Sequence, residues 1–302
     1  MALLDRALVR LLPAVPRSVV RRIAGRYIAG EEIDDAVATV ARLNAEGKTA
    51  TIDVLGEEIH NAEEAQQIVE AYHDTLDAIG EHSLDANVSV KPTALGLKLG
   101  YGVGRGNVET VVRHAAESGN FVRIDMEDST TTDDTLRMYR ELREVGLDNV
   151  GVVFQARLRR TLDDIAALAE LRPNVRICKG IYLEPESIAY MDFEEIRASY
   201  VRSLEALVET ASYVGIATHD EFLISEGKRI ARERYEFQML LGVRPELGNA
   251  LVREGDRLRI YVPFGRQWYE YSLRRLQENP KIAGYVAADT LGRVFARRNG
   301  SR

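Results

Sequence analysis

The sequence predicts a closed (β/α)8 barrel that follows a helical N-terminal arm. Strand-like and helix-like stretches alternate with little interruption from about residue 48 onward, and we count eight strands, each followed by a helical pattern. No linker-like or low-complexity segment divides the chain. We therefore expect an α/β protein with a helical arm at 1–47 and one TIM-type barrel domain at 48–302. An open doubly wound sheet is the alternative architecture.

The strands are recognised by a side-chain period of two, in which apolar and polar residues alternate. Val88 and Val90, for example, alternate with Ser89 and Lys91. We expect strands at residues 50–57, 87–92, 121–128, 150–156, 175–181, 214–220, 235–240 and 258–265. Helical patterns lie between them, for example at 131–146, which closes on a glycine, and at 161–171.

This alternation gives several strands a polar face. Arg123, Asp125 and Glu127 alternate with aliphatic residues, and Glu236 and Gln238 alternate with larger apolar ones. If the apolar face packs against the helices, the polar face points into the barrel, which branched apolar side chains usually fill. Ionisable groups buried there without partners would cost several kcal/mol each. The lining therefore requires either a large polar ligand or an internal salt-bridge network.

Composition and charge exclude several classes of function. The 302 residues are 45% apolar and 29% charged, which is ordinary for a globular domain. The net charge of −7 argues against a general nucleic-acid binder, which needs a basic face to meet phosphates. The single Cys178 excludes an internal disulfide framework and suits a reducing cytosol. We expect no integral membrane protein, because no apolar run approaches the roughly 18 residues of a spanning helix.

The N-terminal segment mixes short apolar runs with arginines. Pro13 and Pro16 interrupt it, which argues against an export signal. A basic amphipathic segment of this kind either packs on its own domain or lies on an anionic membrane surface. We favour packing on the domain, with the helices ending near Gly47.

Residues 259–278 are predicted to hold the last strand and the helix that closes a ligand site. Tyr271, Arg274, Arg275 and Glu278 follow one another at offsets that place them on one helical face. Two neighbouring guanidiniums beside tyrosines suit a small anion such as a carboxylate. The alternative is a pair of solvated arginines.

Lys91 stands at the carboxyl end of the second predicted strand, where barrel enzymes place their chemistry. Its charge is predicted to join the arginine pair around a carboxylate, and the alternative is an ion pair with Asp125 or Glu127. These acids and Asp128 form a cluster whose nearest candidate nitrogen ligand is the distant His219. We therefore expect no metal site.

The glycine-rich stretch at 98–109 does not fit a phosphate-binding motif, because its glycines lack the required spacing and no Gly-Lys-Ser/Thr follows. We interpret it as a mobile loop over the site. A plain connection is favoured over a lid in which Arg105 or Glu109 closes on a ligand.

The stretch RICKGIY places ionisable groups in an otherwise buried strand. Arg176 and Lys179 are its charged residues, and Gly180 permits close approach of a ligand or a bulge. Cys178 is interpreted as a small core residue, since no His-Cys arrangement is present. His219 either contacts a cofactor, carries a proton or has a structural role.

Taken together, SVKPTALG, RIDMED, VVFQARLRRT, RICKGIY, IATHD, YEFQMLLG and IYVPFG…YEYSLRRLQE resemble motifs of the flavin-dependent proline dehydrogenase family in its short monofunctional bacterial form. The similarity runs from about residue 50 to 280. It implies a distorted barrel, non-covalent FAD and oxidation of L-proline to 1-pyrroline-5-carboxylate, with electrons passed to a membrane quinone. We expect a cytoplasmic protein and leave open its peripheral association with the inner face of the cell membrane.

The resemblance also implies roles for individual residues. Lys91, Arg274 and Arg275 look like the clamp on the proline carboxylate, and Asp125 looks like the acid that organises it. The ring would lie between Tyr182, Tyr261 and Tyr271, with Ile177 as its apolar floor. Arg176 is similar to the arginine beside flavin N5, with Asp125, Arg176 and Tyr261 as the catalytic group. The implied cofactor contacts are Met126, Gln155, Lys179, Gly180, Ile181, Thr218, His219 and Glu278.

Two departures from the long bifunctional relatives concern the flavin pocket. Ile181 and Leu183 stand where those relatives have a smaller residue and a tryptophan, and the interval from Tyr261 to Arg274 is shorter than theirs by two residues.

Two other functions are weighed against proline dehydrogenase. The first is a flavin barrel of the methylenetetrahydrofolate reductase type, and the second is a non-catalytic carboxylate-binding barrel.

Overall fold

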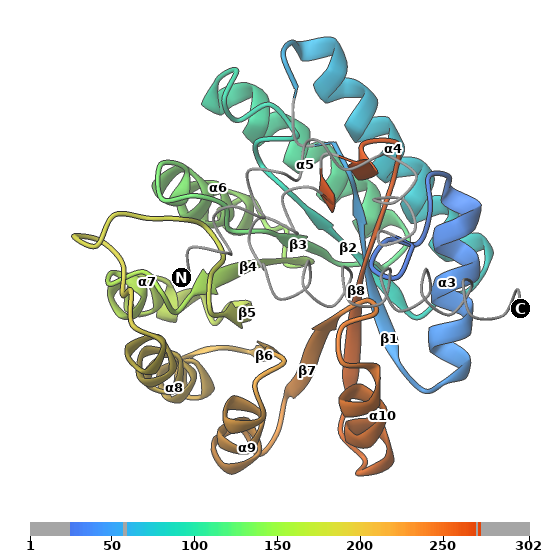
Figure 1. Cartoon of the computed structure of the whole chain (residues 1–302). Coiled ribbons are helices and arrows are strands. Elements are labelled where there is room, and N and C mark those ends of the chain that lie inside the picture. Colours follow the sequence, from blue (N-terminus) through green and yellow to red (C-terminus); the bar gives the residue numbers. More distant parts are fainter. Residues whose placement is uncertain (1–24, 57–58, 270, 273–302) are drawn as a thin grey trace, which may run out of the picture.

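The chain folds into a barrel of eight parallel strands, each joined to the next in chain order and the last to the first. The structure is a computed structural model that describes residues 25–56, 59–269 and 271–272 (Figure 1). The strands are β1 Thr49–Val54, β2 Ala86–Val90, β3 Val122–Ile124, β4 Val150–Gln155, β5 Asn174–Cys178, β6 Tyr213–Ala217, β7 Tyr235–Leu240 and β8 Leu258–Phe264. The predicted closed barrel is confirmed, and the open sheet is wrong.

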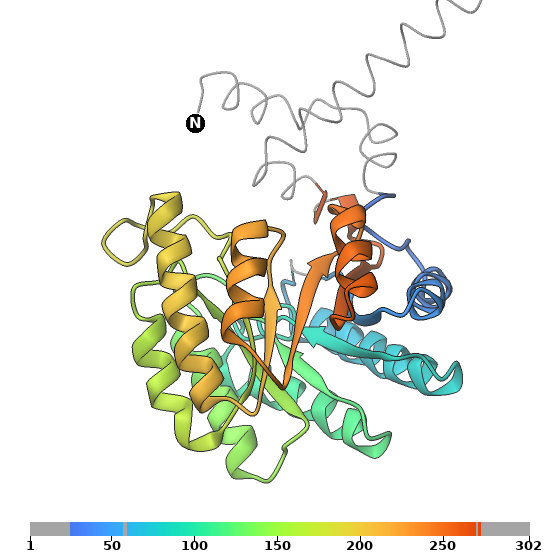
Figure 2. The same cartoon turned by 90° about the horizontal axis from the view of Figure 1, so that it is seen from below.

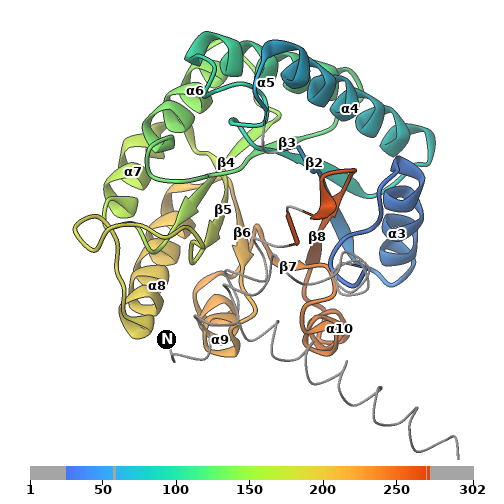
Figure 3. The same cartoon turned by 45° about the horizontal axis from the view of Figure 1, so that its top comes forward.

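Helices form an outer ring around the strands, as Figure 1 and Figure 3 show. They are α3 Ile33–Ala45, α4 Ala62–Glu81, α5 Tyr101–Glu117, α6 Thr132–Glu144, α7 Thr161–Leu168, α8 Phe193–Thr210, α9 Glu221–Ile230 and α10 Pro245–Arg253, with a 3-10 turn at Ala169–Leu171. Among the described residues, no helix combines the length and apolar character needed to cross a membrane.

The main hydrophobic core lies between the strands and this ring. Val88 and Val90 of β2 and Ile124 of β3 are fully buried there, together with apolar side chains of the helices. Because strand side chains alternate, the intervening polar residues face the barrel interior. The predicted division into an outer apolar face and an inner polar face is therefore confirmed.

Arg123 shows how the interior accommodates charge near the amino-terminal end of the strands. Its Nη1 donates to the carbonyls of Val152 and Asn174 at 3.0 and 2.6 Å. Burial, assisted by the nearby Arg176, lowers the pKa of Arg123 to about 9. Gly151 leaves room for this side chain, because a Cβ there would lie 2.4 Å from Nη1 of Arg123. Because Gly151 has no side chain, the buried guanidinium of Arg123 can reach the carbonyl oxygens that accept its hydrogen bonds.

Helix α3 belongs to the outer ring although it precedes the first strand. It lies between α10 and α4 in Figure 3 and buries Ala36, Val40 and Leu43 against the core next to β1 and β8. The helix is capped at Glu46, and Gly47 follows with a φ of +75°, as expected for a glycine just past a helix end. The division into an arm at 1–47 and a barrel at 48–302 remains a prediction.

Two local expectations are corrected. The glycine-rich stretch predicted as a mobile loop begins helix α5, and Arg105 pairs there with Glu109 of the same helix and with Glu141 of α6. Gly104 permits this helix to pack closely, because a Cβ at that position would lie 2.7 Å from the backbone of Leu97. Neither Arg105 nor Glu109 lines the large cavity described below.

The third strand is also shorter than predicted, since β3 ends at Ile124 rather than at residue 128. The backbone amide of Asp125 still donates to the carbonyl of Val90 at 2.8 Å, so pairing with β2 continues for one residue. The chain then leaves the sheet, and Nε2 of Gln155 donates to the carbonyls of Met126 and Glu127 at 3.1 and 2.7 Å. The acidic cluster therefore lies in the loop after β3.

Candidate active site

A cavity of about 1020 Å³ opens at the carboxyl ends of the strands. In the side view of Figure 2, the loop after β5 (yellow) and the segment after β8 (red) lie at this same end of the barrel. The volume is at the upper end of the range for ligand pockets and suits a large cofactor together with a small substrate. The cavity wall includes the predicted site residues Lys91, Asp125, Met126, Gln155, Arg176, Lys179, Gly180, Ile181, Tyr182, Thr218, His219, Tyr261 and Tyr271.

Ile177 is not in that wall. Its side chain is fully buried in the core between the strands and the helices, and the hydroxyl of Tyr200 in α8 donates to its carbonyl at 3.0 Å. The reason is the strand period: because Arg176 points into the barrel, Ile177 must point outward. The structure therefore does not bring Ile177 to the predicted floor of the substrate site. Arg274, Arg275 and Glu278 lie outside the described residues.

Asp125 is the centre of the polar network at the base of the cavity. Its Oδ1 accepts from Oγ of Ser89 at 2.6 Å and from Nη1 of Arg176 at 2.7 Å, and its Oδ2 accepts from the hydroxyl of Tyr261 at 2.9 Å. Four segments of the barrel, β2, β3 with its loop, β5 and β8, thus meet at one carboxylate. Three donors, one of them a guanidinium, hold this carboxylate in a fixed orientation.

Tyr261 acts in this network as a donor. Burial raises the pKa of its phenol well above the usual value, and the nearby Asp125 and Asp53 raise it further. The hydroxyl is therefore protonated at physiological pH. The guanidinium of Arg176 lies over the Tyr261 ring at 5.3 Å, and Nζ of Lys91 lies 3.4 Å from the hydroxyl. Tyr261 thus stands between the two cations that line the cavity base.

Among the described residues, Lys91 pairs with Asp53, which was not predicted from the sequence. Nζ of Lys91 lies 2.6 Å from Oδ2 of Asp53 on β1, so the expected alternative pairing with Asp125 or Glu127 is wrong. Asp53 is fully buried. The signal for it was present, since Thr51 and Asp53 alternate with aliphatic residues, but only the closed barrel shows that the polar face of β1 meets β2.

A second chain of polar contacts holds Arg176 from below. Its Nε donates to Oε1 of Gln238 at 2.6 Å, and Nε2 of Gln238 donates to Oε1 of Glu236 at 2.8 Å. Nε of Arg259 donates to the same oxygen of Glu236 at 2.6 Å. Gly215 makes room for this arrangement, because a Cβ there would lie 2.3 Å from Nε2 of Gln238. The internal salt-bridge network that the sequence left open is therefore present beneath the cavity.

The cavity rim carries a cluster of cations and aromatic rings. Asp220 accepts from Nζ of Lys179 at 2.6 Å and from Nη2 of Arg197 at 2.7 Å. The guanidinium of Arg197 lies 4.4 Å from the ring centre of Phe193 and 5.0 Å from that of Phe222. Nη1 of Arg197 also donates to Oε1 of Glu194 at 3.0 Å, so the two cations are matched by two carboxylates. Lys179 and Arg197 both line the cavity, where their remaining donors suit an anionic group such as a phosphate.

Asp220 is ionised within this cluster. Burial alone would raise its pKa, but hydrogen bonds from Arg197 and Lys179 outweigh burial and hold the pKa well below its usual range. The same carboxylate caps helix α9 by accepting from the backbone amide of Phe222 at 3.1 Å. Nearby, Nε2 of His219 accepts from the backbone amide of Leu240 at 3.0 Å, which leaves the proton of a neutral ring on Nδ1.

The loop after β5 is anchored to the loops after β4 and β3. Nη1 of Arg157 donates to the carbonyl of Tyr182 at 2.9 Å. Oγ and the backbone amide of Ser129, in the loop after β3, donate to the carboxylate of Glu184 at 2.6 and 2.7 Å. At the opposite wall, Tyr271 packs with Ile28 and Leu55. Side chains from both ends of the described chain thus meet at the cavity.

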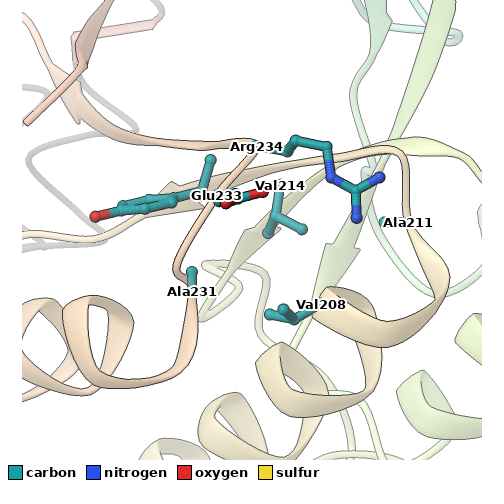
Figure 4. A pocket seen from close by; sticks show the side chains of 7 residues that line it. Val208, Ala211, Val214, Ala231, Glu233 and Arg234 are labelled. Carbon is teal, nitrogen blue, oxygen red and sulfur yellow. The ribbon is translucent and has the colours of Figure 1, made fainter.

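A second, much smaller cavity lies at the other end of the barrel, near the starts of β6 and β7. Figure 4 shows its lining, which includes Val208, Ala211, Val214, Ala231 and Arg234. Its volume of about 10 Å³ leaves room for no more than one water molecule. Within the part of the chain that the structure describes, no group of three or more acidic, His or Cys side chains is arranged to hold a metal ion.

A large cavity with charged side chains at the carboxyl ends of the strands is typical of a barrel enzyme that acts on a small polar substrate. Comparisons with known proteins identify the family. Residues 36–288 match the family model described as Proline dehydrogenase.

Curated relatives agree with this match over nearly their whole length. The chain is 37% identical to the proline dehydrogenase of Deinococcus radiodurans over 89% of this chain and 90% of that protein. It is 36% identical to proline dehydrogenase 1 of Bacillus subtilis strain 168, over 87% of this chain and 89% of that protein. The chain belongs to the proline dehydrogenase family.

A solved structure supports the same relationship. Proline utilization A from Bdellovibrio bacteriovorus, in a crystal structure of the protein inactivated by N-propargylglycine, superposes with a TM-score of 0.78 and 25% identity. The superposition covers 89% of this chain and 36% of that longer chain. The family predicted from the sequence is confirmed, and the folate-reductase type and the non-catalytic barrel are set aside.

Proposed function

We propose that this enzyme oxidises L-proline to 1-pyrroline-5-carboxylate with non-covalently bound FAD and passes the electrons to a membrane quinone. The proline dehydrogenase activity follows from family membership. The family is flavin-dependent, whereas FAD as the particular flavin, the quinone acceptor and the residue roles are parts of the proposal. The observation that carries it is the closed polar network Lys91–Tyr261–Asp125–Arg176 at the base of a cavity large enough for both ligands.

The cavity fits a flavin dinucleotide in three respects. Its volume of about 1020 Å³ exceeds what proline alone requires. Gly180, at a φ of +94°, lets the backbone pass close to Gln155, where a Cβ would lie 2.7 Å from Oε1. The cations Lys179 and Arg197 in the cavity wall suit the pyrophosphate. We assign Arg176, Gln155, Lys179, Thr218 and His219 to hold the cofactor, with Met126, Gly180 and Ile181 beside it.

The substrate is proposed to lie between this cofactor and the network at the cavity base. Lys91 would bind the carboxylate, and Arg274, Arg275 and Glu278 would complete the site from the segment outside the described residues. Tyr182, Tyr261 and Tyr271 line the cavity as expected for walls around a small ring. Binding of the proline carboxylate would hold the substrate against the flavin in one orientation. Such positioning of two reactants can supply a large part of the rate enhancement.

The chemistry supplied by a bound flavin is acceptance of a hydride from the carbon next to the amine. Arg176 is held by Asp125 and Gln238 at 2.7 and 2.6 Å, so its charge is oriented before the reaction begins. A guanidinium fixed in this way stabilises negative charge that develops at the cofactor more than it stabilises the ground state.

The amine of proline must lose its proton before its carbon gives up hydride. Tyr261 is not the base, because burial and two carboxylates keep its phenol protonated. Asp125 is a weak candidate, because its oxygens already accept from Ser89, Arg176 and Tyr261. We propose that water carries this proton, and activity should therefore fall in acid.

The quinone and the membrane are proposed as partners of the cavity mouth. In the loop after β5, the side chains of Ile181 and Leu183 are 44% and 89% exposed, which suits an apolar acceptor better than a charged one. We propose a cytoplasmic enzyme that meets the inner face of the cell membrane peripherally. A sedimentation assay with vesicles, with and without a quinone in the bilayer, tests this part independently of the chemistry.

The visible spectrum of the purified protein tests the central proposal. We expect flavin absorbance that bleaches on anaerobic addition of L-proline and recovers when a soluble quinone is added. Denaturation should release the flavin, and chromatography should identify it as FAD. A protein that stays colourless after incubation with FAD, or a flavin that proline does not reduce, would contradict the proposal.

A further inference from the structure

The support of Lys91 extends from the barrel interior to the outer ring of helices. Oδ2 of Asp53 lies 2.6 Å from Nζ of Lys91, and its Oδ1 lies 3.3 Å from the hydroxyl of Tyr72 in α4. That hydroxyl donates to the carbonyl of Ser89 at 2.7 Å. Asp53 and Tyr72 are both fully buried. Asp53 is thus held between the lysine of the cavity and a tyrosine behind it.

We propose that Asp53, seated by Tyr72, is the positioning residue for Lys91. It fixes the direction of the ammonium group and keeps that group charged in the alkaline range in which the amine of proline loses its proton. The inference rests on the proposed function of Lys91 as a ligand of the proline carboxylate. Asp53 is set behind Lys91 and is not assigned any contact with proline.

Lys91 needs partners that fix the direction of its ammonium group. A lysine ammonium is a point charge on a flexible four-carbon chain, and its three donors can rotate. Here one donor is directed to Asp53 and another faces the hydroxyl of Tyr261 at 3.4 Å, while the side chain as a whole is about nine-tenths buried. Two fixed partners on β1 and β8 therefore aim Lys91, which directly follows β2, into the cavity that it lines.

The positive charge of Lys91 also depends on its neighbours. A buried amine without an opposite charge loses its proton more readily than one in water. Within the described residues, the titratable and charged groups near Lys91 include the carboxylates of Asp53 and Asp125, the phenols of Tyr72 and Tyr261, and the guanidinium of Arg176. Asp125 is engaged with Arg176 at 2.7 Å, and Asp53 contacts Nζ of Lys91 directly at 2.6 Å.

Tyr72 completes the arrangement because it remains a donor. Burial raises the pKa of its phenol well above the usual value, and the charge of Asp53 raises it further. The single proton of the Tyr72 hydroxyl is shared between the Ser89 carbonyl at 2.7 Å and Oδ1 of Asp53 at 3.3 Å, and this shared hydrogen bond holds the side of the carboxylate that faces away from Lys91. Ser89 in turn donates to Asp125, so the same support reaches both acids of the network.

The test uses the full-length enzyme with bound FAD and measures anaerobic flavin reduction by L-proline from pH 7 to 9.5. Asp53→Asn keeps the shape and removes the charge. We expect the apparent dissociation constant for proline to rise roughly 10- to 100-fold, as for loss of a charge-assisted hydrogen bond. The rise should increase with pH, while the limiting rate of reduction near neutral pH falls much less. Tyr72→Phe should give a smaller rise with the same trend.

Asp164→Asn is the matched control. Asp164 is another carboxylate of low exposure in an ion pair, with Arg160 at 2.8 Å in helix α7, and it does not line the cavity. This variant should leave the proline constant and its pH dependence unchanged. Combining Asp53→Asn with Lys91→Met should add little to the effect of Lys91→Met alone, because the two residues are proposed to act as a unit.

An Asp53→Asn enzyme that keeps the wild-type dissociation constant and pH dependence would overturn the inference, and so would additive effects in the double variant. If Asp53→Asn fails to retain FAD, Tyr72→Phe decides, and wild-type behaviour of that variant would overturn the inference. A wild-type protein whose flavin proline does not reduce would instead refute the proposed function.

Discussion

The hydroxyl of Tyr261 donates to Oδ2 of Asp125 at 2.9 Å and joins the last strand of the barrel to the loop after the third. The two residues are 136 positions apart in the chain, and only closure of the barrel brings them together. Asp125 also binds Arg176, and Tyr261 also faces Lys91. This hydrogen bond therefore links the two cations of the cavity base into one network.

Tyr261→Phe should remove that link without removing the ring. Asp125 would keep its bonds to Ser89 and Arg176, so we expect the fold and the bound flavin to persist. The loss of one hydrogen bond to a charged group, on the order of 1.5–3 kcal/mol, predicts a fall in kcat/KM for proline of roughly 10- to 100-fold. Steady-state kinetics with a quinone acceptor measures it. A change below twofold would show that the link does not contribute.

Arg274→Met tests the carboxylate clamp while FAD remains bound. Removing one guanidinium from a buried carboxylate should cost about 2–5 kcal/mol of substrate binding. The Michaelis constant for proline should therefore rise strongly, with a smaller change in the spectrum of the oxidised flavin. An unchanged Michaelis constant would remove Arg274 from the proposed site.

Gly215→Ala should disturb Arg176 through Gln238. The new Cβ would lie 2.3 Å from Nε2 of Gln238, and that side chain holds Nε of Arg176 at 2.6 Å. We expect a slower rate of flavin reduction and a loss of about 1–3 kcal/mol of stability from overpacking. Stopped-flow absorbance and thermal unfolding measure the two effects.

Gly106→Ala is the control for that variant. Gly106 lies in helix α5 with no atom within 4 Å of the added Cβ. Replacing a helical glycine by alanine there should leave the rate unchanged and stabilise the helix by up to about 1 kcal/mol. Equal losses of rate in both variants would contradict the proposed route from Gly215 to Arg176.

Asp220→Asn should reduce the dependence of stability on acid pH. Arg197 and Lys179 hold the pKa of Asp220 below its unfolded value, so the unfolded chain binds more protons in the acid range. The stability that this carboxylate contributes is therefore present above its unfolded pKa of about 4 and is lost as pH falls through the folded value. At pH 7 the variant should melt several degrees below the wild type, and the gap should narrow toward pH 3.

Asp192→Asn provides the comparison for Asp220. Asp192 caps helix α8 by accepting from the backbone amides of Glu194 and Glu195 at 2.9 and 3.1 Å. Asparagine caps a helix about as well as aspartate. Its melting temperature should follow that of the wild type across the pH range. A gap for Asp220→Asn that stays constant with pH would contradict an ionic contribution of Asp220 to stability, because that contribution must fade as the carboxylate is protonated.

Much of the fold was predictable because each strand carries its own signal. The period of two located every strand to within a few residues, and β7 was predicted with its observed bounds, Tyr235–Leu240. The local sequence pattern predicted secondary structure less well where tertiary packing favours a different conformation. The glycines at 98–109 indicated a loop, yet Gly104 serves close packing of α5 on the backbone of Leu97.

Residues of the candidate site could be predicted where they belong to a family motif or to the polar face of a strand. Thirteen predicted residues line the cavity, but Ile177 does not, because adjacent strand residues point in opposite directions. Arg197 and Phe193 at the rim gave no signal, since a helix surface carries many such residues. Gln238 was predicted to lie on the polar face of its strand, but its hydrogen bond with Arg176 was not predicted.

The sequence by itself determined the order of strands and helices, the inward polarity of the barrel and the family, because period, composition and motifs are properties of short segments. Only the tertiary structure decided which charges are partners. Lys91 is paired with Asp53, 38 residues away, and not with the nearer Asp125 or Glu127. The physical reason is that a buried charge is stabilised by whatever opposite charge the closed barrel brings within hydrogen-bond distance, and strand register and closure, not separation along the chain, set that distance.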